Sequence, residues 1–277
     1  MGSLDGPRRL IVNADDFGRS DSINAAVIRA HQEGILTTAS LMVNGDAFTE
    51  AVSLAKQNPN LGVGLHLTLV CGRSTLPPSD IPGLAASNHS FSDDPVATGL
   101  KLFFWRALIP QLRREMAAQF HKFRQTGLPL DHVNGHLNLH LHPTVFRILM
   151  EHANEWDLRT IRLTREPLRL NLQIAKGRWT YRLSHAAIFG LLSRHAEPVL
   201  IRQRIQHTAA VFGLLQNARV GEEYVRKLIP SLPGGDSELY SHPSLEEFKH
   251  ELDALVSPRV RHLIREHRIE LIRYQDL

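Results

Sequence analysis

Two adjacent carboxylates are the first residues in the chain that could do chemistry. Asp15 and Asp16 follow the apolar run 10–14 and precede Gly18. Such a run, bounded by Gly and by an amphipathic segment, is typical of a buried strand that leads into a helix. Neighbouring residues at a strand end point in different directions, so one carboxylate can hold a metal ion while the other handles a proton. Capping of the next helix and solvation are the alternative roles of an isolated Asp pair.

Histidines are concentrated between residues 132 and 142, at positions His132, His136, His140 and His142. Spacings of four, four and two would place the first three on one face of a helix. The Asn134-Gly135 pair and the flanking Val and Leu residues instead favour a strand end that turns into a loop. Two imidazoles and one carboxylate bind zinc-like ions and leave positions open for water and substrate. For each histidine taken alone, a cap or a hydrogen-bonded core position is an equally good interpretation.

Two further histidines lie at predicted strand ends. His66 lies in the apolar run 62–69, and His242 follows the run 237–241. Alone, His66 is better read as a core residue, and His242 could cap a helix that starts near Ser244. The argument for function is collective, because strand ends converge at one mouth of a barrel. This convergence predicts a mononuclear metal site, with His242 placed to protonate a leaving group.

The elements that must position these residues alternate along the chain. We predict strands at about 9–14, 38–44, 62–69, 130–134, 159–163, 207–212 and 237–241, and a terminal strand within 267–274. Helices are predicted at 20–34, 46–57, 106–125, 143–155 and 219–229, and from Ser244, where a capping-box pattern begins. The alternation, without internal repeats or linkers, predicts one barrel-like parallel α/β domain over residues 9–277.

Three segments depart from this alternation. Residues 1–8 read as a disordered leader. Residues 72–100 are rich in Pro, Gly, Ser and Asp, which indicates a surface excursion or a lid. Residues 165–205 mix Leu, Arg and aromatic residues, and we interpret them as a helical insertion whose apolar face is a candidate substrate wall.

Composition narrows the function classes. The single cysteine, Cys71, excludes an intramolecular disulfide and fits a reducing compartment. We find no apolar signal region and no run long enough to span a bilayer, so a cytoplasmic location is expected. The net charge is +4 and the pI about 9.4, without a regular basic helix or interleaved aromatics, which argues against nucleic acid as a partner. An anionic membrane surface or a lipid-linked substrate is compatible with this charge.

Four motifs together resemble the YdjC-like family of carbohydrate deacetylases. They are Asn13-Ala14-Asp15-Asp16-Phe17-Gly18, Gly64-Leu65-His66-Leu67, the cluster 132–143 and Glu238-Leu239-Tyr240-Ser241-His242-Pro243. The motifs follow one another in family order over nearly the whole chain. The resemblance implies a distorted (β/α) TIM-like barrel and metal-dependent removal of acetyl from an N-acetylated sugar.

The resemblance also implies roles for individual residues. It suggests Asp16, His66 and His136 as ligands of one divalent metal ion, zinc or magnesium, with cobalt or manganese also compatible. The ion would polarise the acetamide carbonyl and lower the pKa of its bound water. Asp15 would accept the proton of that water as general base, and His242 would protonate the departing amine as general acid. The reverse assignment, with Asp15 as ligand and Asp16 as base, is the alternative.

Substrate contacts are expected from three more residues, Arg162, His140 and Glu238. For Arg162, which follows a predicted strand, two roles are open. Its guanidinium can orient a sugar hydroxyl or restrain Asp15 electrostatically.

The third motif departs from the common family pattern. Where an acidic residue is often found, this chain has Asn134, so the motif does not supply a carboxylate behind the metal ligands. This form of the motif resembles the branch associated with hopanoid biosynthesis, whose implied substrate is a hopanoid carrying N-acetylglucosamine. The apolar, Arg-rich segment 165–205 suits such a lipid, although an ordinary packing helix has the same pattern. An N-acetylated sugar or glycolipid is the expected partner, with peripheral membrane contact and a homodimer left open.

Three other functions fit parts of the pattern. A chito-oligosaccharide deacetylase would use the same residues on a different substrate. A metal-dependent phosphoesterase or isomerase on a similar barrel would need a second metal or a phosphate clamp, and the sequence has no Gly-rich phosphate loop. A sugar-binding protein would need the ligands but not the acid and the base.

Overall fold

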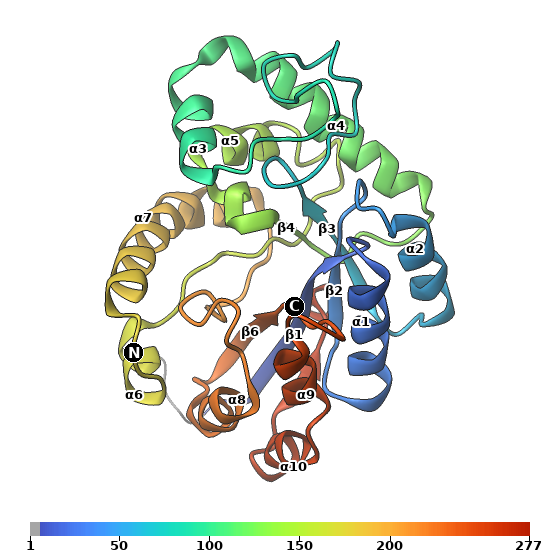
Figure 1. Ribbon diagram of the computed structural model, residues 1–277. Coiled ribbons are helices and arrows are strands. Elements are labelled where there is room, and N and C mark those ends of the chain that lie inside the picture. The colour runs from blue at the N-terminus through green and yellow to red at the C-terminus, as the bar shows by residue number, and fades with distance from the viewer. Residues whose placement is uncertain (1–5) are drawn as a thin grey trace.

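One curled sheet of parallel strands forms the centre of the molecule (Figure 1). The computed structural model describes residues 6–277. The strands are β1 (Arg8–Phe17), β2 (Thr38–Leu41), β3 (Gly62–Leu67), β4 (Val133–Gly135), β5 (Ala210–Phe212), β6 (Gly235–Ser241) and β7 (Glu270–Ile272). Their order is β4-β3-β2-β1-β6-β5, and β7 pairs with the first half of β1. β1 is therefore the central strand, and its carboxyl end carries the Asp pair.

An extended segment joins the two edges of this sheet. The predicted strand 159–163 forms no continuous ladder, but it bridges β4 on one side and residue 206, just before β5, on the other. The backbone N–H of Val133 donates to Thr160, and that of Ile161 donates to the carbonyl of residue 206. These bonds connect β4 to the region of β5, which makes the sheet an irregular barrel. The predicted α/β class, the single domain and the distorted barrel are confirmed.

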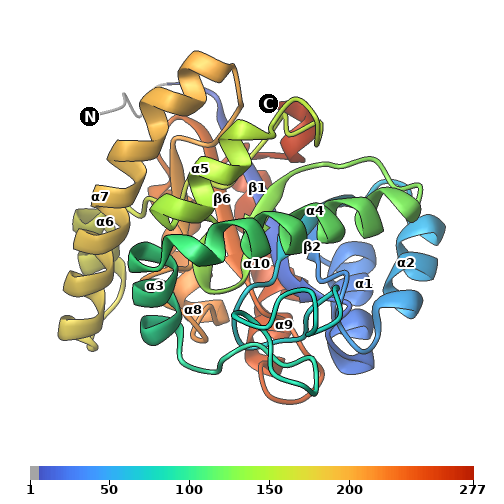
Figure 2. The ribbon, with the colours of Figure 1, turned by 90° about the horizontal axis from the view of Figure 1, so that it is seen from above.

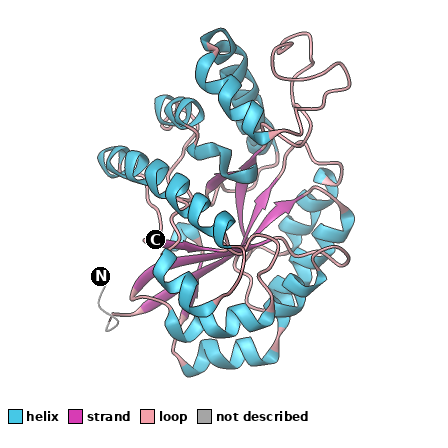
Figure 3. Ribbon diagram, turned by 60° about the vertical axis from the view of Figure 1, so that its left-hand side comes forward, coloured by secondary structure: helices cyan, strands magenta, loops and turns pink. Residues whose placement is uncertain are grey.

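Helices pack around the outside of the barrel (Figure 2). They are α1 (Asp21–Glu33), α2 (Phe48–Gln57), α3 (Pro95–Phe104), α4 (Ile109–Gln125), α5 (Pro143–Glu151), α6 (Leu168–Ile174), α7 (Trp179–Gln203), α8 (Glu222–Leu228), α9 (Lys249–Val256) and α10 (Pro258–Glu266). Figure 3 shows the strands enclosed by these helices. Residues 10–17 of β1 are all buried, including the polar Asn13, Asp15 and Asp16.

Local signals place several helices correctly. α1 begins after Ser20, whose hydroxyl accepts from the N–H of Ile23, and it ends at Gly34, as predicted. Gly34 is also required by packing, because a Cβ there would lie 2.4 Å from the carbonyl of Leu255. The segment 165–205 forms α6 and α7, in agreement with the predicted helical insertion.

Other boundaries were predicted wrongly. No helix begins at Ser244: α9 starts at Lys249, and the Ser244 hydroxyl accepts from the N–H of Phe248 to close a turn instead. The excursion 72–100 contains the start of α3, which Asp94 caps through the N–H groups of Val96 and Ala97. In the predicted leader, residue 8 already belongs to β1, and residues 1–5 lie outside the described residues. Within the described chain, no helix is long and apolar enough to cross a membrane.

Candidate active site

A bulge at the end of β1 places both members of the Asp pair at the barrel mouth. The pairing of β1 with β2 is interrupted between Ala14 and Phe17. Asp16 has a φ of 66°, a left-handed conformation that few non-glycine residues adopt. In a regular strand, consecutive side chains point to opposite faces. The bulge removes this alternation, and Asp15 and Asp16 are both only 3% exposed.

Asp16 is the centre of a buried cluster with two histidines. Its Oδ1 lies 3.2 Å from His66 Nε2 and 3.0 Å from His136 Nδ1, and the two ring nitrogens are 3.3 Å apart. Arg19 donates to the other carboxylate oxygen at 2.9 Å. One carboxylate oxygen and two imidazole nitrogens that converge on a single point are a suitable donor set for a divalent ion. The three residues expected as metal ligands are thus brought together.

Asn134 orients His66 from behind the cluster. The Nδ1 of His66 donates to Asn134 Oδ1 at 2.7 Å, which leaves the lone pair of Nε2 directed at Asp16 and His136. The amide nitrogen of Asn134 donates to Asp15 Oδ1 at 3.0 Å and to Ser40 Oγ at 2.8 Å. The amide of Asn134, in place of a carboxylate, therefore contacts both His66 and Asp15. An ionised carboxylate at this position would accept from His66, but it could not donate to Asp15.

Asp15 is fixed by an arginine buried at its back. Arg162 Nη1 and Nη2 donate to the two carboxylate oxygens at 2.7 and 2.9 Å, and the same guanidinium donates twice to Glu238 Oε1. The hydroxyl of Tyr274 donates to the other oxygen of Glu238, and the ring of Tyr240 lies 4.1 Å from the guanidinium carbon. Burial by itself would raise the pKa of Asp15, but the charge and hydrogen bonds of the Arg162 guanidinium hold that pKa well below its usual range. Asp15 is therefore ionised.

His242 lies beside Asp15 and is accessible. Its Nε2 is 4.0 Å from Asp15 Oδ2, and its side chain is 20% exposed. Glu251, fully buried on α9, accepts from the N–H of His242 at 2.6 Å and from that of Val220 at 2.9 Å. The predicted acid and base are thus neighbours on one side of the site.

Other predicted site residues lie deeper in the barrel. His140 is fully buried and bonds through Nε2 to the carbonyl of Arg162, and burial lowers its pKa to about 3. Arg162 and Glu238 are also fully buried. None of these three side chains reaches the surface or lines the cleft. Arg162 restrains Asp15, the second role open to it, and His140 and Glu238 both bond to Arg162. His132 bonds to Ser40 in the core, and His142 caps α5, the alternatives considered for them.

A cleft of about 330 Å³ opens over Asp15 and His242. Its polar end also includes Asn138 and Tyr240. Leu137 and Asn138 both have left-handed backbone conformations, with φ of 52° and 57°. The remaining wall is mostly apolar or aromatic and comes from α3, α7 and two loops: Pro95, Val96, Leu137, Leu139, Tyr181, His185, Ile188, Phe189, Leu214 and Asn217. α7 therefore lines the cleft, as suggested for the insertion.

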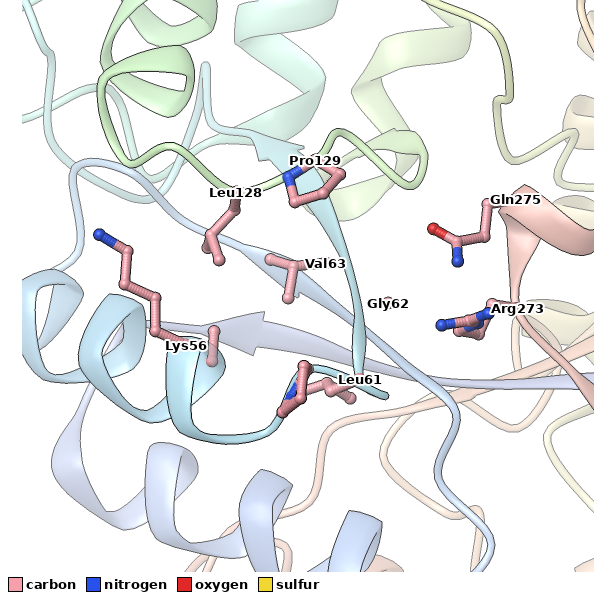
Figure 4. Close-up of a pocket in the computed structure, with 10 residues that line it drawn as sticks. Lys56, Leu61, Gly62, Val63, Leu128, Pro129, Arg273 and Gln275 are labelled. Carbon is pink, nitrogen blue, oxygen red and sulfur yellow. The ribbon is translucent and has the colours of Figure 1, made fainter.

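Another cavity lies at the opposite end of the barrel (Figure 4). It has a volume of about 290 Å³ and is lined by the start of β3, at Gly62 and Val63, and by Lys56, Arg273 and Gln275 among others. Functional groups in α/β barrels are found at the carboxyl ends of the strands. The cleft over Asp15, and not this cavity, is consequently the candidate active site.

Several residues of the site could not be found from the sequence. Asn13, Ser40, Tyr240 and Glu251 all bond or pack against the predicted residues. The only signal was that Asn13 and Tyr240 belong to the motifs that carry Asp15 and His242. Ser40 and Glu251 come from other elements and carry no local mark.

Comparisons with known proteins place the chain among relatives. Residues 9–266 match the sequence profile of a family described as YdjC-like protein. A carbohydrate deacetylase of Brevibacillus brevis is 39% identical over 150 residues, which are 53% of this chain and 56% of the relative. The chain thus aligns with little more than half of that relative. A carbohydrate deacetylase of Clostridium beijerinckii is 31% identical over 273 residues, 97% of this chain and 100% of the relative.

A solved structure shares the fold. The crystal structure of a candidate cellobiose-phosphate cleavage protein from Enterococcus faecalis superimposes with a TM-score of 0.73 and 21% identity. The match covers 98% of this chain and 99% of the other. At this identity the similarity establishes the architecture and not the reaction.

Proposed function

The chain belongs to the YdjC-like family, and from its site we propose that it is a metal-dependent carbohydrate N-deacetylase. The observation that carries the proposal is that a metal-ligating cluster lies beside an acid–base pair. The donor atoms of Asp16, His66 and His136 converge beside an ionised Asp15, which faces the accessible His242. A metal-ligand set next to a cleft that contains a base and an acid supplies the components of amide hydrolysis.

Asp16, His66 and His136 would hold the ion. When bound, it would polarise the acetamide carbonyl and lower the pKa of an attacking water. Asn134 keeps His66 in the tautomer with a free Nε2, which a ligand histidine requires. Zinc, magnesium, cobalt and manganese are all compatible with this donor set.

The protons are handled by Asp15 and His242. Asp15 Oδ1 accepts from Asn13, Asn134 and Arg162, whereas Oδ2 accepts from Arg162 alone and lies 4.0 Å from His242 Nε2. We therefore assign Oδ2 as the atom that takes a proton from water. Water adds its oxygen to the acetyl carbon, the C–N bond breaks, and His242 gives a proton to the departing amine. Acetate and a free amino sugar are the products.

The substrate we propose is an N-acetylglucosamine-type sugar on a hopanoid glycolipid. Support comes from the form of the third motif and from the cleft, which is polar at Asp15 and His242 and apolar along α3 and α7. An apolar wall beside a polar end suits a sugar joined to a lipid. A chito-oligosaccharide is the alternative substrate, and it would leave the apolar wall in contact with sugar faces only. A cytoplasmic location at a membrane surface belongs to the same proposal.

Mass spectrometry of the metal-loaded protein tests the reaction and the substrate together. The protein is incubated separately with an N-acetylglucosaminyl hopanoid and with diacetylchitobiose, with Asp15→Asn as the control. We expect loss of one acetyl group from the hopanoid and none with Asp15→Asn. Loss from chitobiose alone would retain the deacetylase and reject the glycolipid. No loss from either substrate would reject the deacetylase.

Metal content separates this proposal from a phosphoesterase. Among residues 6–277 the structure shows one cluster of at least three metal-ligating side chains. We expect one ion per chain, whereas a two-metal phosphoesterase would bind two. A sugar-binding protein would keep sugar affinity in Asp15→Asn and show no turnover in any form.

A further inference from the structure

Exposed hydrophobic side chains are gathered on one side of the molecule. Within residues 6–277, eleven of the twelve large hydrophobic side chains that stand out as exposed belong to 96–105, to Leu137 or to α7. Leu245 is the twelfth. Phe104 is 68% exposed, Trp105 59% and Leu191 69%. Isolated exposed apolar residues are ordinary, but a concentration of this kind marks an interaction surface.

α3 and α7 carry this surface and lie on the same side of the barrel in two perpendicular views (Figures 1 and 2). Both helices line the candidate active-site cleft, α3 through Val96 and α7 through Ile188. These two residues are themselves among the exposed hydrophobics. The exposed apolar residues of both helices therefore reach the cleft mouth, where Val96, Leu137 and Ile188 lie. We call it the α3/α7 face, made of Val96, Leu100, Phe103, Phe104, Trp105, Leu137, Trp179, Leu183, Ile188, Leu191 and Ile201.

Around the α3/α7 face cations outnumber carboxylates, and the exposed carboxylates next to α3 are Asp93 and Asp94 at its start. Residues 95–114 contain four Lys and Arg and no Asp or Glu. In α7 the acidic residue is Glu197, and Arg165 neutralises it through two hydrogen bonds at 2.7 and 2.9 Å. Arg106, Arg194 and Arg202 are exposed and form no ion pair with any described residue. Aromatic and aliphatic side chains among unpaired cations match the interface of an anionic bilayer.

We propose that the α3/α7 face docks on an anionic phospholipid bilayer, with the cleft mouth turned to the lipid surface. The purpose of this docking rests on the proposed function, since a sugar carried by a membrane lipid would enter the cleft directly from the bilayer. A second copy of the chain is a poorer occupant. A symmetric pair would bring the same cations of both copies together and would cover the cleft.

Vesicle flotation tests the docking without any catalysis. The protein is mixed with vesicles of phosphatidylcholine alone or with added phosphatidylglycerol, and the floating fraction gives the partition coefficient. The apolar variant is Phe104→Ser with Trp105→Ser, and the charge variant is Arg194→Glu with Arg202→Glu. None of these residues lines the cleft. The matched controls are Leu245→Ser and Arg265→Glu, exposed positions outside the α3/α7 face.

Wild type is expected to bind the anionic vesicles and to release them at high salt. The apolar variant should bind at least about tenfold more weakly. The charge variant should lose at least about 25-fold, since each basic residue near an anionic surface contributes roughly fivefold. Both controls should bind as wild type does.

Three results would overturn the proposal. The first is failure of wild type to float with anionic vesicles, and the second is equal binding by wild type and the apolar variant. The third is a wild-type dimer seen by light scattering without vesicles, together with a monomeric apolar variant. The last result would assign the α3/α7 face to a second copy. Turnover of diacetylchitobiose by the same variants is scored separately. If docking fails while the sugar is deacetylated, the proposed function stands; if vesicles bind and no acetylated sugar is turned over, only the docking survives.

Discussion

Replacement of Arg162 by Met tests how the barrel interior holds Asp15. The guanidinium makes four hydrogen bonds to two carboxylates, Asp15 and Glu238, whose side chains are 4% and 0% exposed. Loss of one partner of a buried ion pair typically costs about 3–5 kcal/mol, because a charge is left buried and unpaired. Asp15 keeps two amide donors and Glu238 keeps the hydroxyl of Tyr274. We therefore expect Arg162→Met to lower the free energy of unfolding by about 4 kcal/mol near pH 8. This figure is the total for Asp15 and Glu238 together.

The loss should depend on pH in a defined direction. In wild type the folded pKa of Asp15 is depressed, so this carboxylate stabilises the fold above its unfolded pKa. In Arg162→Met burial dominates and raises the folded pKa, so the folded state binds a proton more tightly than the unfolded state. Stability of the variant then recovers as the pH falls. The difference from wild type should decrease to about 2 kcal/mol near pH 5.

Urea unfolding with a chelator present measures this difference without a contribution from metal. Arg165→Met is the matched control, because Arg165 forms the same two-pronged pair with Glu197 at the surface, where the side chains are 33% and 29% exposed. Its cost should stay below about 1 kcal/mol. Arg162→Lys, which keeps a charge, serves if the Met variant does not fold. The reasoning would be refuted if Arg162→Met lost no more stability than Arg165→Met. It would also be refuted if the stability loss of Arg162→Met were the same at pH 8 and pH 5.

Three further predictions follow from single groups. Burial raises the pKa of Glu166 from 4.5 to about 7, so the folded state holds the proton more tightly than the unfolded state. The free energy of unfolding should therefore fall by about 3 kcal/mol as the pH rises across that range. Glu166→Gln should flatten this pH dependence in urea unfolding, and an unchanged pH dependence would contradict the prediction. Gly64→Ala should lower the free energy of unfolding by about 2–3 kcal/mol, since its Cβ would lie 2.5 Å from the ring of His132. Gly190→Ala has open space around the new Cβ and should be neutral or stabilising. Thermal unfolding of both variants measures the difference. Zinc at a thousandfold excess over its Kd should add about 4 kcal/mol to the free energy of unfolding, a chelator should remove it, and Asp16→Asn should show no such gain.

Much of the fold was available from local sequence patterns. The buried run 10–14, the capping of α1 by Ser20 and Gly34, and the alternation of strands and helices depend on residues close together in the chain. The convergence of Asp16, His66 and His136 followed from the parallel arrangement, because each residue comes at the carboxyl end of its strand. The capping-box pattern at Ser244 failed, because such a pattern is local and the chain closes a turn before α9 begins.

The supporting interactions were decided only by tertiary structure. Arg162 meets Asp15 from 147 positions along the chain, and Glu251 holds His242 from another element. The bulge at Asp16, which turns both carboxylates into one site, depends on how β1 pairs with β2. The α3/α7 face was equally hidden, since a pattern of apolar residues predicts that a helix has an apolar side, whereas exposure depends on what packs against that side. Residue types and short spacings fix which groups are present, and only the folded barrel decides which of them are buried, paired or exposed.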